Sequence, residues 1–359
     1  MKKLDVYIIK KFLGTFFFII AIFILITIVF DISEKIDDFL DREAPLKAIV
    51  FDYYCTFIPW LYSMLNALIV FLAVIFFTSK LASNNEIVAI LSSGISFNRL
   101  LRPYLISAVM LLILSIFINH FLIPITNLRK LDFENKYYHD TGHIDPGVNI
   151  HRKLKPDLFL YISNYGVISK TGYNFGLDQL KNGQLISQFK AERLVWDTTS
   201  GKWSAKNWRI RTIDGLNETF EYGNSKDTVL SFHPADFSDK PNLIATMNYF
   251  EMTKFIEEEK QKGSGFVKRY ELELHKRTAI PFSILILTII GVCISARKIK
   301  GGLGMHLVYG ISLGLIYVFL SRVGEVFATN TSLPSVFAVW LPNLFFSVVA
   351  YFIYRFAPK

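Results

Sequence analysis

The chain has 359 residues, a formal net charge of +9 and a hydrophobic fraction of 52%. Soluble domains contain about 45–50% apolar residues on a scale that counts glycine and omits tyrosine. This composition, with a positive mean hydropathy, therefore indicates an integral membrane protein and excludes a wholly soluble one. Its two cysteines, Cys55 and Cys293, lie in apolar runs, so the polar middle of the chain has no disulfide framework and no thiolate metal site.

Six long uncharged runs, three on each side of a polar stretch, dominate the sequence. A transmembrane helix needs about 18 or more apolar residues, because it rises about 1.5 Å per residue and must cross the hydrocarbon core. The first run is too long for a signal-peptide core and leads into Asp31 rather than a small-x-small cleavage site, so we expect a retained helix. The six expected transmembrane helices are 12–30, 53–79, 103–128, 278–296, 301–321 and 326–354.

Basic residues at the ends of these runs predict the orientation, because Lys and Arg near helix ends tend to stay in the cytoplasm. Acidic residues dominate after the first run: Asp31, Glu34, Asp37, Asp38, Asp41 and Glu43. Basic residues dominate at both termini and in the second and fourth loops: Lys2, Lys3, Lys10, Lys11, Lys80, Arg99, Arg102, Arg297, Lys298, Lys300, Arg355 and Lys359. The pattern predicts cytoplasmic termini and a central domain outside. It also accounts for much of the net charge, so a nucleic-acid partner is not favoured.

The loop between the second and third runs predicts a short cytoplasmic helix at 84–94. Asparagines precede an acidic first turn at Glu86, and Gly94 suits a helix end. Ile87, Ile90 and Leu91 form an apolar face. Such a helix can transmit motion from a partner, and a merely interfacial linker helix explains the same pattern.

The polar stretch predicts a β-rich domain, because apolar and polar residues alternate in 158–162, 187–195 and 208–212. Turn signals separate these segments: Asn182-Gly183, Ser200-Gly201, Asp214-Gly215 and Gly223-Asn224. The pattern fits a sandwich or a jelly roll. Helical spacing then appears in 247–262 and ends at the Gly263-Ser264-Gly265 break, which predicts a connecting helix leading to the fourth span.

Motifs for enzymatic chemistry are missing from the sequence. The glycines of 301–304 are followed by Met305 and His306, so they do not match the G-x-x-x-x-G-K-[ST] phosphate loop. Neither H-E-x-x-H nor G-x-S-x-G occurs, and the outer histidines show no ligand spacing: His139, His143, His151 and His233. We therefore expect a transport protein without its own nucleotide site, cofactor or metal, and disfavour a membrane-anchored envelope enzyme.

Four segments resemble those of the LptF/LptG permease family: LDVYIIKKF at 4–12, NEIVAILSSG at 85–94, LHKRTAIPFS at 274–283 and KGGLG at 300–304. The resemblance spans essentially the whole chain, including the arrangement of three plus three helices around an external domain. Members of this family are membrane subunits of the bacterial lipopolysaccharide exporter, an ABC transporter of the inner membrane. The alternative of a lipoprotein-releasing or MacB-like permease is disfavoured, because those proteins place their large outer domain after the first helix.

The resemblance implies a membrane α-helical fold with six transmembrane helices and an inserted periplasmic all-β, jelly-roll-like domain. The expected divisions are an N-terminal bundle at 1–130, the β domain at 131–246, a connecting helix and linker at 247–270, and a C-terminal bundle at 271–359. The implied partners are a homologous permease, an LptB-type ATPase dimer and an LptC-type bridge protein. Segment 310–355, with Leu333-Pro334 and Leu341-Pro342, favours LptG over LptF.

In such a permease, segment 84–94 would be the coupling helix, with Glu86 meeting basic groups on the ATPase and Ile87, Ile90 and Leu91 providing attachment. Gly310 and Gly314 form a small-xxx-small pair on the fifth helix, which permits close helix contact. In the family, helices one and five line the junction between the permeases. These glycines therefore belong either to that gate or to packing within the chain's own bundle.

Cations near the outer ends of helices one and five are candidate contacts for a phosphorylated glycolipid: Lys35, Arg42 and Arg322, with Glu325 beside the last. Some LptG members carry a lysine cluster after helix one that contacts the lipid. Here the surroundings of Lys35 are acidic. Charges that are solvated or paired with one another explain most of these residues equally well.

Overall fold

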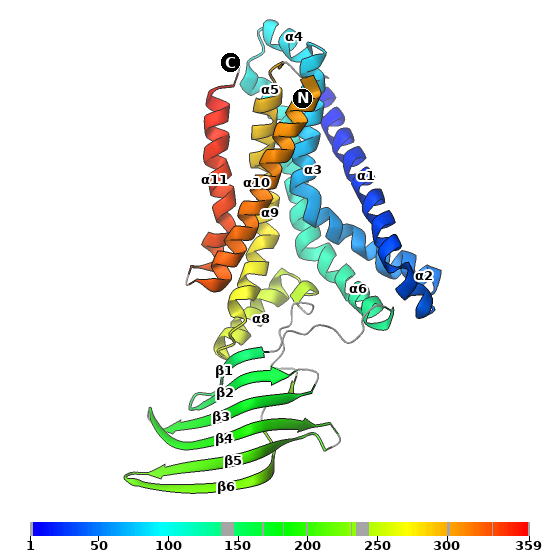
Figure 1. Ribbon diagram of the computed structural model, residues 1–359. Coiled ribbons are helices and arrows are strands. Elements are labelled where there is room, and N and C mark those ends of the chain that lie inside the picture. The colour runs from blue at the N-terminus through cyan, green and yellow to red at the C-terminus, as the bar shows by residue number, and fades with distance from the viewer. Residues whose placement is uncertain are drawn as a thin grey trace. The chain divides into compact units, whose positions relative to one another are not determined.

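The computed structural model divides into two compact units, which are described separately (Figure 1). A helical unit contains Met1–His139, Ala245–Tyr249 and Glu271–Lys359, and a second unit contains Asp140–Ile244 and Phe250–Tyr270. The structure describes residues 3–137, 147–166, 169–181, 183–198, 200–230, 232–234, 244–299, 302–331 and 333–357. Seven positions named in the sequence analysis lie outside these residues: Lys2, His139, His143, Asn182, Lys300, Gly301 and Lys359.

Six helical spans are long and apolar enough to cross a membrane, which confirms the predicted number among the described residues. They are α1 (Lys3–Asp41); α2 (Leu46–Ala48), η1 (Ile49–Tyr54) and α3 (Cys55–Ser83); α5 (Phe97–Phe117), η2 (Ile118–Leu122) and α6 (Ile123–Tyr137); α9 (Val267–Ser295); α10 (Gly302–Asn330); and α11 (Ser335–Arg355). Here η denotes a π-helical segment. The short helix α4 (Glu86–Ser92) joins the second span to the third.

The predicted start of the sixth span at residue 326 is wrong, because α10 continues to Asn330 and α11 begins at Ser335. Pro334 causes this break. Its backbone is extended, with φ −61° and ψ 135°, which places it at the N-cap of α11, and a proline disfavours helical geometry in the residue before it. The first span also runs on past its apolar run to Asp41, so the acidic residues from Asp31 to Asp41 are helical.

α3 is the central helix of the helical unit and lies between α1 and α10 (Figure 1). In the most apolar segment of the span that contains α3, 67% of the residues are buried, whereas in the most apolar segment of α1 only 17% are. Polar side chains also join the spans, since Asn66 Nδ2 donates to Ser115 Oγ at 2.7 Å and Tyr317 Oη donates to Asn343 Oδ1 at 3.0 Å. Within a membrane such groups need protein partners, so these bonds help to set which helices pack together.

Both chain termini and α4 lie at the same end of the helical unit (Figure 1). We call this the basic end, because its exposed or partly exposed cations come from the start of α1, the ends of α3 and α11, the start of α5 and the α9–α10 connection: Lys10, Lys11, Lys80, Arg99, Arg102, Arg297, Lys298 and Arg355. The α10–α11 connection and α2 lie at the opposite end (Figure 1).

The second unit contains one antiparallel sheet with its strands in chain order from β1 to β6. The all-β character of the insert is confirmed. The described strands form this single meander, whereas a sandwich or jelly roll would have two packed sheets. The strands are β1 (Gly147–Lys155), β2 (Leu158–Gly166), β3 (Thr171–Lys181), β4 (Gln184–Asp197), β5 (Lys202–Asp214) and β6 (Asn217–Thr228).

The predicted glycine turns at Gly201 and Gly215 close the β4–β5 and β5–β6 hairpins, and both glycines have a positive φ. Gly183 also has a positive φ between β3 and β4. Gly223 is different, because it lies within β6 opposite Trp208, so the turn predicted there is wrong. A Cβ at Gly223 would lie only 3.0–3.1 Å from the indole of Trp208, so a glycine here makes room for the ring.

Buried apolar residues of β1 to β5 form one cluster with Phe232, and the side chains of Trp203 and Phe232 are among the largest fully buried ones. Trp203 Nε1 donates to the carbonyl of Phe232 at 2.9 Å. The helix predicted over 247–262 is present as α8 (Tyr249–Gln261), and Gly263 ends it with φ +64°. Arg152 on β1 and Glu259 on α8 form an ion pair of 3.3 Å in which both side chains are more than 90% buried.

Candidate functional site

α4 is a seven-residue helix held between two strongly bent connections at the basic end. Asn85 precedes it in the left-handed conformation with φ +62°, and Gly94 follows it with φ +83°. Ser96 then caps α5 by accepting a bond from the backbone N–H of Arg99 at 3.4 Å. The short helix predicted from the sequence is therefore present, although Asn85 makes no side-chain cap.

Glu86 is the first residue of α4, and its carboxylate has partners on two elements. Tyr7 of α1 donates its hydroxyl to Glu86 Oε2 at 3.0 Å, and Asn84 Nδ2 donates to Oε1 at 3.2 Å. The neighbouring Asn85 accepts a bond from Lys298 Nζ, in the α9–α10 connection, at 3.4 Å. The start of α4 is thus attached to the helices on both sides.

The apolar face of α4 is turned into the chain. Ile87 is 1% exposed and belongs to the main core of the helical unit, while Ile90 and Leu91 are partly buried against that core. Ile87 is therefore a core residue of this structure, and its attachment to a partner surface stays a prediction. Val88, which is 55% exposed, provides the outer surface of α4 together with Ala89, Ser92, Ser93 and Gly94.

An ion pair joins α1 to α5 beside α4. Arg99 Nη1 and Nη2 donate to the two carboxylate oxygens of Asp5 at 2.7 and 2.8 Å, and Asp5 is 5% exposed. Sequence reasoning missed both this pair and the bond between Tyr7 and Glu86. One signal was available, since Asp5 is the only acid among the lysines at the start of the chain.

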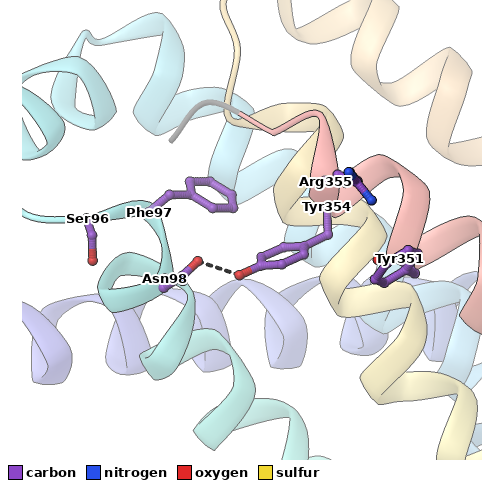
Figure 2. Close-up of a pocket in the computed structure, with 6 residues that line it drawn as sticks. All are labelled: Ser96, Phe97, Asn98, Tyr351, Tyr354 and Arg355. Atoms are coloured by element: carbon purple, nitrogen blue, oxygen red, sulfur yellow. Dashed lines mark hydrogen bonds between the residues drawn. The ribbon is translucent and has the colours of Figure 1, made fainter.

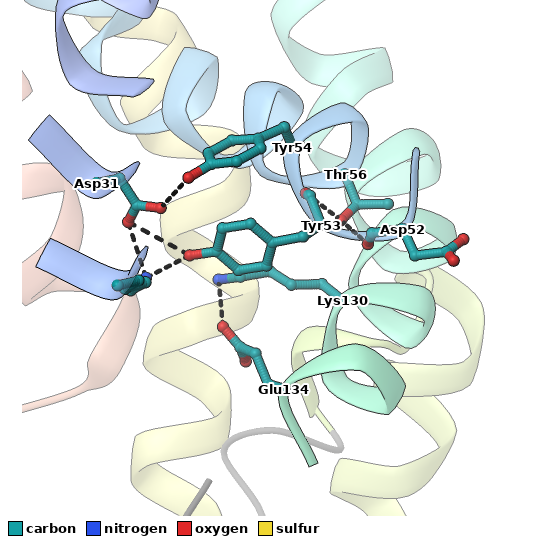
Figure 3. A network of polar contacts seen from close by, with 8 residues as sticks. Asp31, Asp52, Tyr53, Tyr54, Thr56, Lys130 and Glu134 are labelled. Atoms are coloured by element: carbon teal, nitrogen blue, oxygen red, sulfur yellow. Dashed lines mark hydrogen bonds and ion pairs between the residues drawn. The ribbon is translucent and has the colours of Figure 1, made fainter. Parts of the chain in front are cut away.

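Asp31 and Tyr53 belong to a polar network beside the second half of α1 (Figure 3), and Lys35 of α1 bonds to both. Its ammonium group donates to Asp31 Oδ1 at 2.8 Å and to the hydroxyl of Tyr53, and it lies 4.9 Å from the centroid of the Tyr53 ring. Tyr54 donates to the other Asp31 oxygen at 3.1 Å. The side chain of Lys35 is 14% exposed, so the alternative of mutually paired charges describes it better than that of a free lipid contact.

Lys130 and Glu134 of α6 form a second ion pair beside this network, at 3.4 Å (Figure 3). The Lys130 ammonium also lies 5.0 Å from the Trp60 ring centroid, within the range of a cation–π contact. Arg42 follows the last residue of α1 and is partly exposed.

Arg322 and Glu325 line a cavity of about 380 Å³ in the helical unit. Glu325 forms ion pairs of 3.2 Å with both Arg322 and Lys276. The Arg322 side chain is 64% exposed, so it is far more accessible than Lys35. The other lining residues come from α3, η2, α6, the 245–249 segment, α9 and α10: Trp60, Ser63, Met64, Ala67, Leu68, Asn119, Ile123, Asn127, Ala245, Glu273, Arg277, Ile280, Tyr317, Val318 and Ser321.

Gly310 and Gly314 pack against α3 of the same chain. A Cβ at Gly310 would overlap the Cδ1 atom of Ile75, and a Cβ at Gly314 would lie 2.5 Å from Leu68 Cδ1. Of the two interpretations open from the sequence, the structure therefore shows packing within the chain's own bundle.

A further cavity of about 470 Å³ lies at the basic end between the start of α5 and the end of α11 (Figure 2). Tyr354 Oη donates to Asn98 Oδ1 across it at 2.5 Å. Its described lining includes the charged Arg355 together with Ser96, Phe97 and Tyr351.

A family model described as "Lipopolysaccharide export system permease LptF/LptG" matches residues 6–356. The match includes both groups of spans, α4 and the β insert. No curated protein matches the chain.

Proposed function

The chain belongs to the lipopolysaccharide export permease family LptF/LptG, and we propose that it is a permease subunit that extracts lipopolysaccharide from the bacterial inner membrane. The observation that carries this proposal is the family match over residues 6–356. Because that match includes the insert as well as both helix groups, it supports the function of a whole permease rather than that of one shared segment.

A separate ATPase would supply the energy, since the sequence has no phosphate-binding loop of the Walker type. The outer face of α4, with Val88 at its centre, and the partly exposed Glu86 carboxylate are the surface we assign to this partner. A cation of the ATPase would find Glu86 held in place by Tyr7. An exposed ion pair at the edge of an interface contributes about 0.2–1 kcal/mol, so the Glu86 pair would align the ATPase on α4 more than it would strengthen binding.

A second permease of the same family would cover the exposed apolar side of α1. Large apolar residues there are exposed to 66% at Phe18, 64% at Leu25, 66% at Val29 and 72% at Phe30. The matched model includes both paralogues, and segment 310–355 favours LptG for this chain.

The basic end of the helical unit would lie in the cytoplasm, with the termini and α4, because Lys and Arg concentrate there. The β insert would then lie in the periplasm and pass the lipid towards an LptC-type bridge protein. Reaction of single introduced cysteines with a membrane-impermeant maleimide tests this orientation. Labelling of intact spheroplasts at the β insert, but not at the C-terminal tail, is the expected result.

Copurification tests the function itself. The chain should be isolated with its native partners, and bound lipid should be identified by mass spectrometry. Vesicles containing the complex should then release lipopolysaccharide to a soluble acceptor on addition of ATP, and a complex with a hydrolysis-deficient ATPase should not. Stable association with no ATPase, or ATP-dependent release of another envelope lipid or of lipoprotein instead, would contradict the proposal.

A further inference from the structure

The first turns of α1 form polar contacts with α4, whose outer face we assign to the ATPase, and with the first turn of α5. Tyr7 bonds to Glu86 at the start of α4, and Asp5 binds Arg99 on the first turn of α5. We propose that Tyr7 and the pair of Asp5 and Arg99 are positioning residues for transport, which make α1 move when α4 is displaced. This inference rests on the proposed function, because it assumes that a partner ATPase displaces α4.

The pair of Asp5 and Arg99 provides a contact with defined geometry. Both guanidinium nitrogens engage both carboxylate oxygens, so the pair resists rotation as well as separation. The Asp5 side chain is 7% exposed, so loss of Arg99 would leave a carboxylate in a poorly hydrated site. A shift of the first turn of α5 is therefore expected to take the start of α1 with it.

The Glu86 carboxylate can hold Tyr7 and a partner at the same time. An ionised carboxylate has about four acceptor positions, and Tyr7 and Asn84 use one on each oxygen. The side chain is partly exposed, so the remaining positions can face a cation of the ATPase. Tyr7 would thus connect α1 directly to the residue that the motor contacts.

Apolar packing reinforces both contacts. Ile87 of α4 shares one buried cluster with Ile8 and Phe12 of α1 and with Phe97 of α5. Because protein interiors are close-packed, α4 cannot shift into this cluster without displacing its neighbours. Among the residues that the structure describes, the polar attachment of α4 to the α9–α10 connection is weaker, since the bond from Lys298 Nζ to Asn85 Oδ1 is 3.4 Å long.

α1 is also built to carry such a displacement along its length. Its buried residues are Asp5, Ile8, Phe12, Phe16 and Ile20, followed only by Phe39. None of the residues from 21 to 38 is buried in the chain. Residues 21–30 lie between these first turns and the contacts of Asp31 with η1, and all of them are exposed or partly exposed, so α1 can carry a movement at the basic end to its exposed apolar face.

The test uses the full complex of this chain with its partner permease and ATPase, and its readout is the amount of lipopolysaccharide released per ATP hydrolysed. Tyr7→Phe removes only the hydroxyl, and Arg99→Gln removes the bidentate pair. Matched controls are Tyr309→Phe on α10, where the side chain is 48% exposed, and Arg102→Gln, an exposed arginine on α5.

We expect Tyr7→Phe to lower the ratio by about two- to fivefold, because one exposed hydrogen bond is lost. Arg99→Gln should lower it further. The charge-exchanged double variant Asp5→Arg with Arg99→Asp should recover part of the loss. Glu86→Gln retains an acceptor for Tyr7 but removes the charge, so it should weaken ATPase association rather than the ratio in the assembled complex.

A probe on α1 separates coupling from a merely structural role. With Cys55 and Cys293 replaced, a spin label at Phe30→Cys, a position that is 72% exposed, reports the movement of α1 on addition of ATP. The movement should shrink in Tyr7→Phe and stay unchanged in Tyr309→Phe. Because Tyr7→Phe is a mild change, it keeps the test decisive even where Arg99→Gln lowers expression.

Normal release per ATP together with a normal movement of the label in Tyr7→Phe and Arg99→Gln would overturn the inference. The proposed function fails in a different way, since the unmodified chain would then show no ATPase association or no ATP-dependent release of lipopolysaccharide.

Discussion

Gly324→Ala should destabilise the helical unit, even though alanine is the better helix former. A Cβ at position 324 would lie 2.6 Å from the backbone carbonyl oxygen of Ala338 on α11. This carbonyl lacks its usual helical donor, because the residue four positions later is Pro342, which has no N–H. The oxygen lies against Gly324 instead, and a backbone atom cannot rotate away as a side chain can.

The expected magnitude follows from two opposing effects. Replacing glycine by alanine inside a helix gains about 1 kcal/mol in helix propensity. The carbonyl must move about 0.7–1.0 Å to reach an ordinary C···O separation of about 3.3–3.6 Å, and overpacking of this kind costs about 1–3 kcal/mol. Gly324→Ala should therefore lower the free energy of unfolding by up to about 2 kcal/mol.

Two matched variants separate these effects. Gly14→Ala on α1 has no atom within 4 Å of the new Cβ, so it should gain stability. Gly310→Ala meets only the tip of Ile75, which can rotate away, so it should fall between the other two. Titration of the purified protein with SDS in mixed micelles, followed by circular dichroism, measures the order. A Gly324→Ala protein as stable as Gly14→Ala would refute the reasoning.

Three further predictions concern α4, the insert and the cavity. Ile87→Ala should cost about 2–5 kcal/mol of stability in the same SDS titration, because it empties a core position, whereas Val88→Ala should leave stability within about 0.5 kcal/mol and weaken ATPase copurification. Arg152→Met leaves the buried Glu259 carboxylate with Lys262 as an ion-pair partner at 3.3 Å, and it should destabilise the insert by about 1–3 kcal/mol, measured by pulse proteolysis in urea. Arg322→Glu should reduce photo-crosslinking to lipopolysaccharide without changing the SDS midpoint, and undiminished crosslinking would exclude Arg322 as a contact.

The spans and α4 could be predicted from the sequence because their causes are local. A helix that crosses a bilayer requires about 20 apolar residues in succession, so each run identifies its own span. The boundary at Pro334 was missed because Val326 and Phe327 extend the apolar character beyond the real connection. In the insert, alternation identifies strands, but it does not specify their neighbours, and the single meander sheet could not be distinguished from two packed sheets.

Contacts between distant residues could not be predicted in the same way. Tyr7 and Glu86 are 79 positions apart, and Asp5 and Arg99 are 94 apart. Their pairing depends on how α1 packs against α4 and α5, which no local pattern records. The glycine spacing at 310 and 314 likewise predicted a close helix contact without identifying α3 as the neighbour.

Existing ion pairs decide which of the two basic residues, Lys35 or Arg322, is more available to a phosphorylated lipid. A ligand phosphate at Lys35 must compete with Asp31, two oxygen atoms of which already engage Lys35, Tyr53 and Tyr54. At Arg322 it competes with a single contact to Glu325, and Glu325 retains Lys276 as a second cation if Arg322 turns away. Since both candidates are basic side chains, accessibility and the number of existing partners decide between them. Arg322 is therefore the better candidate for contact with a phosphorylated lipid, whereas Lys35 is better suited to hold α1 against η1.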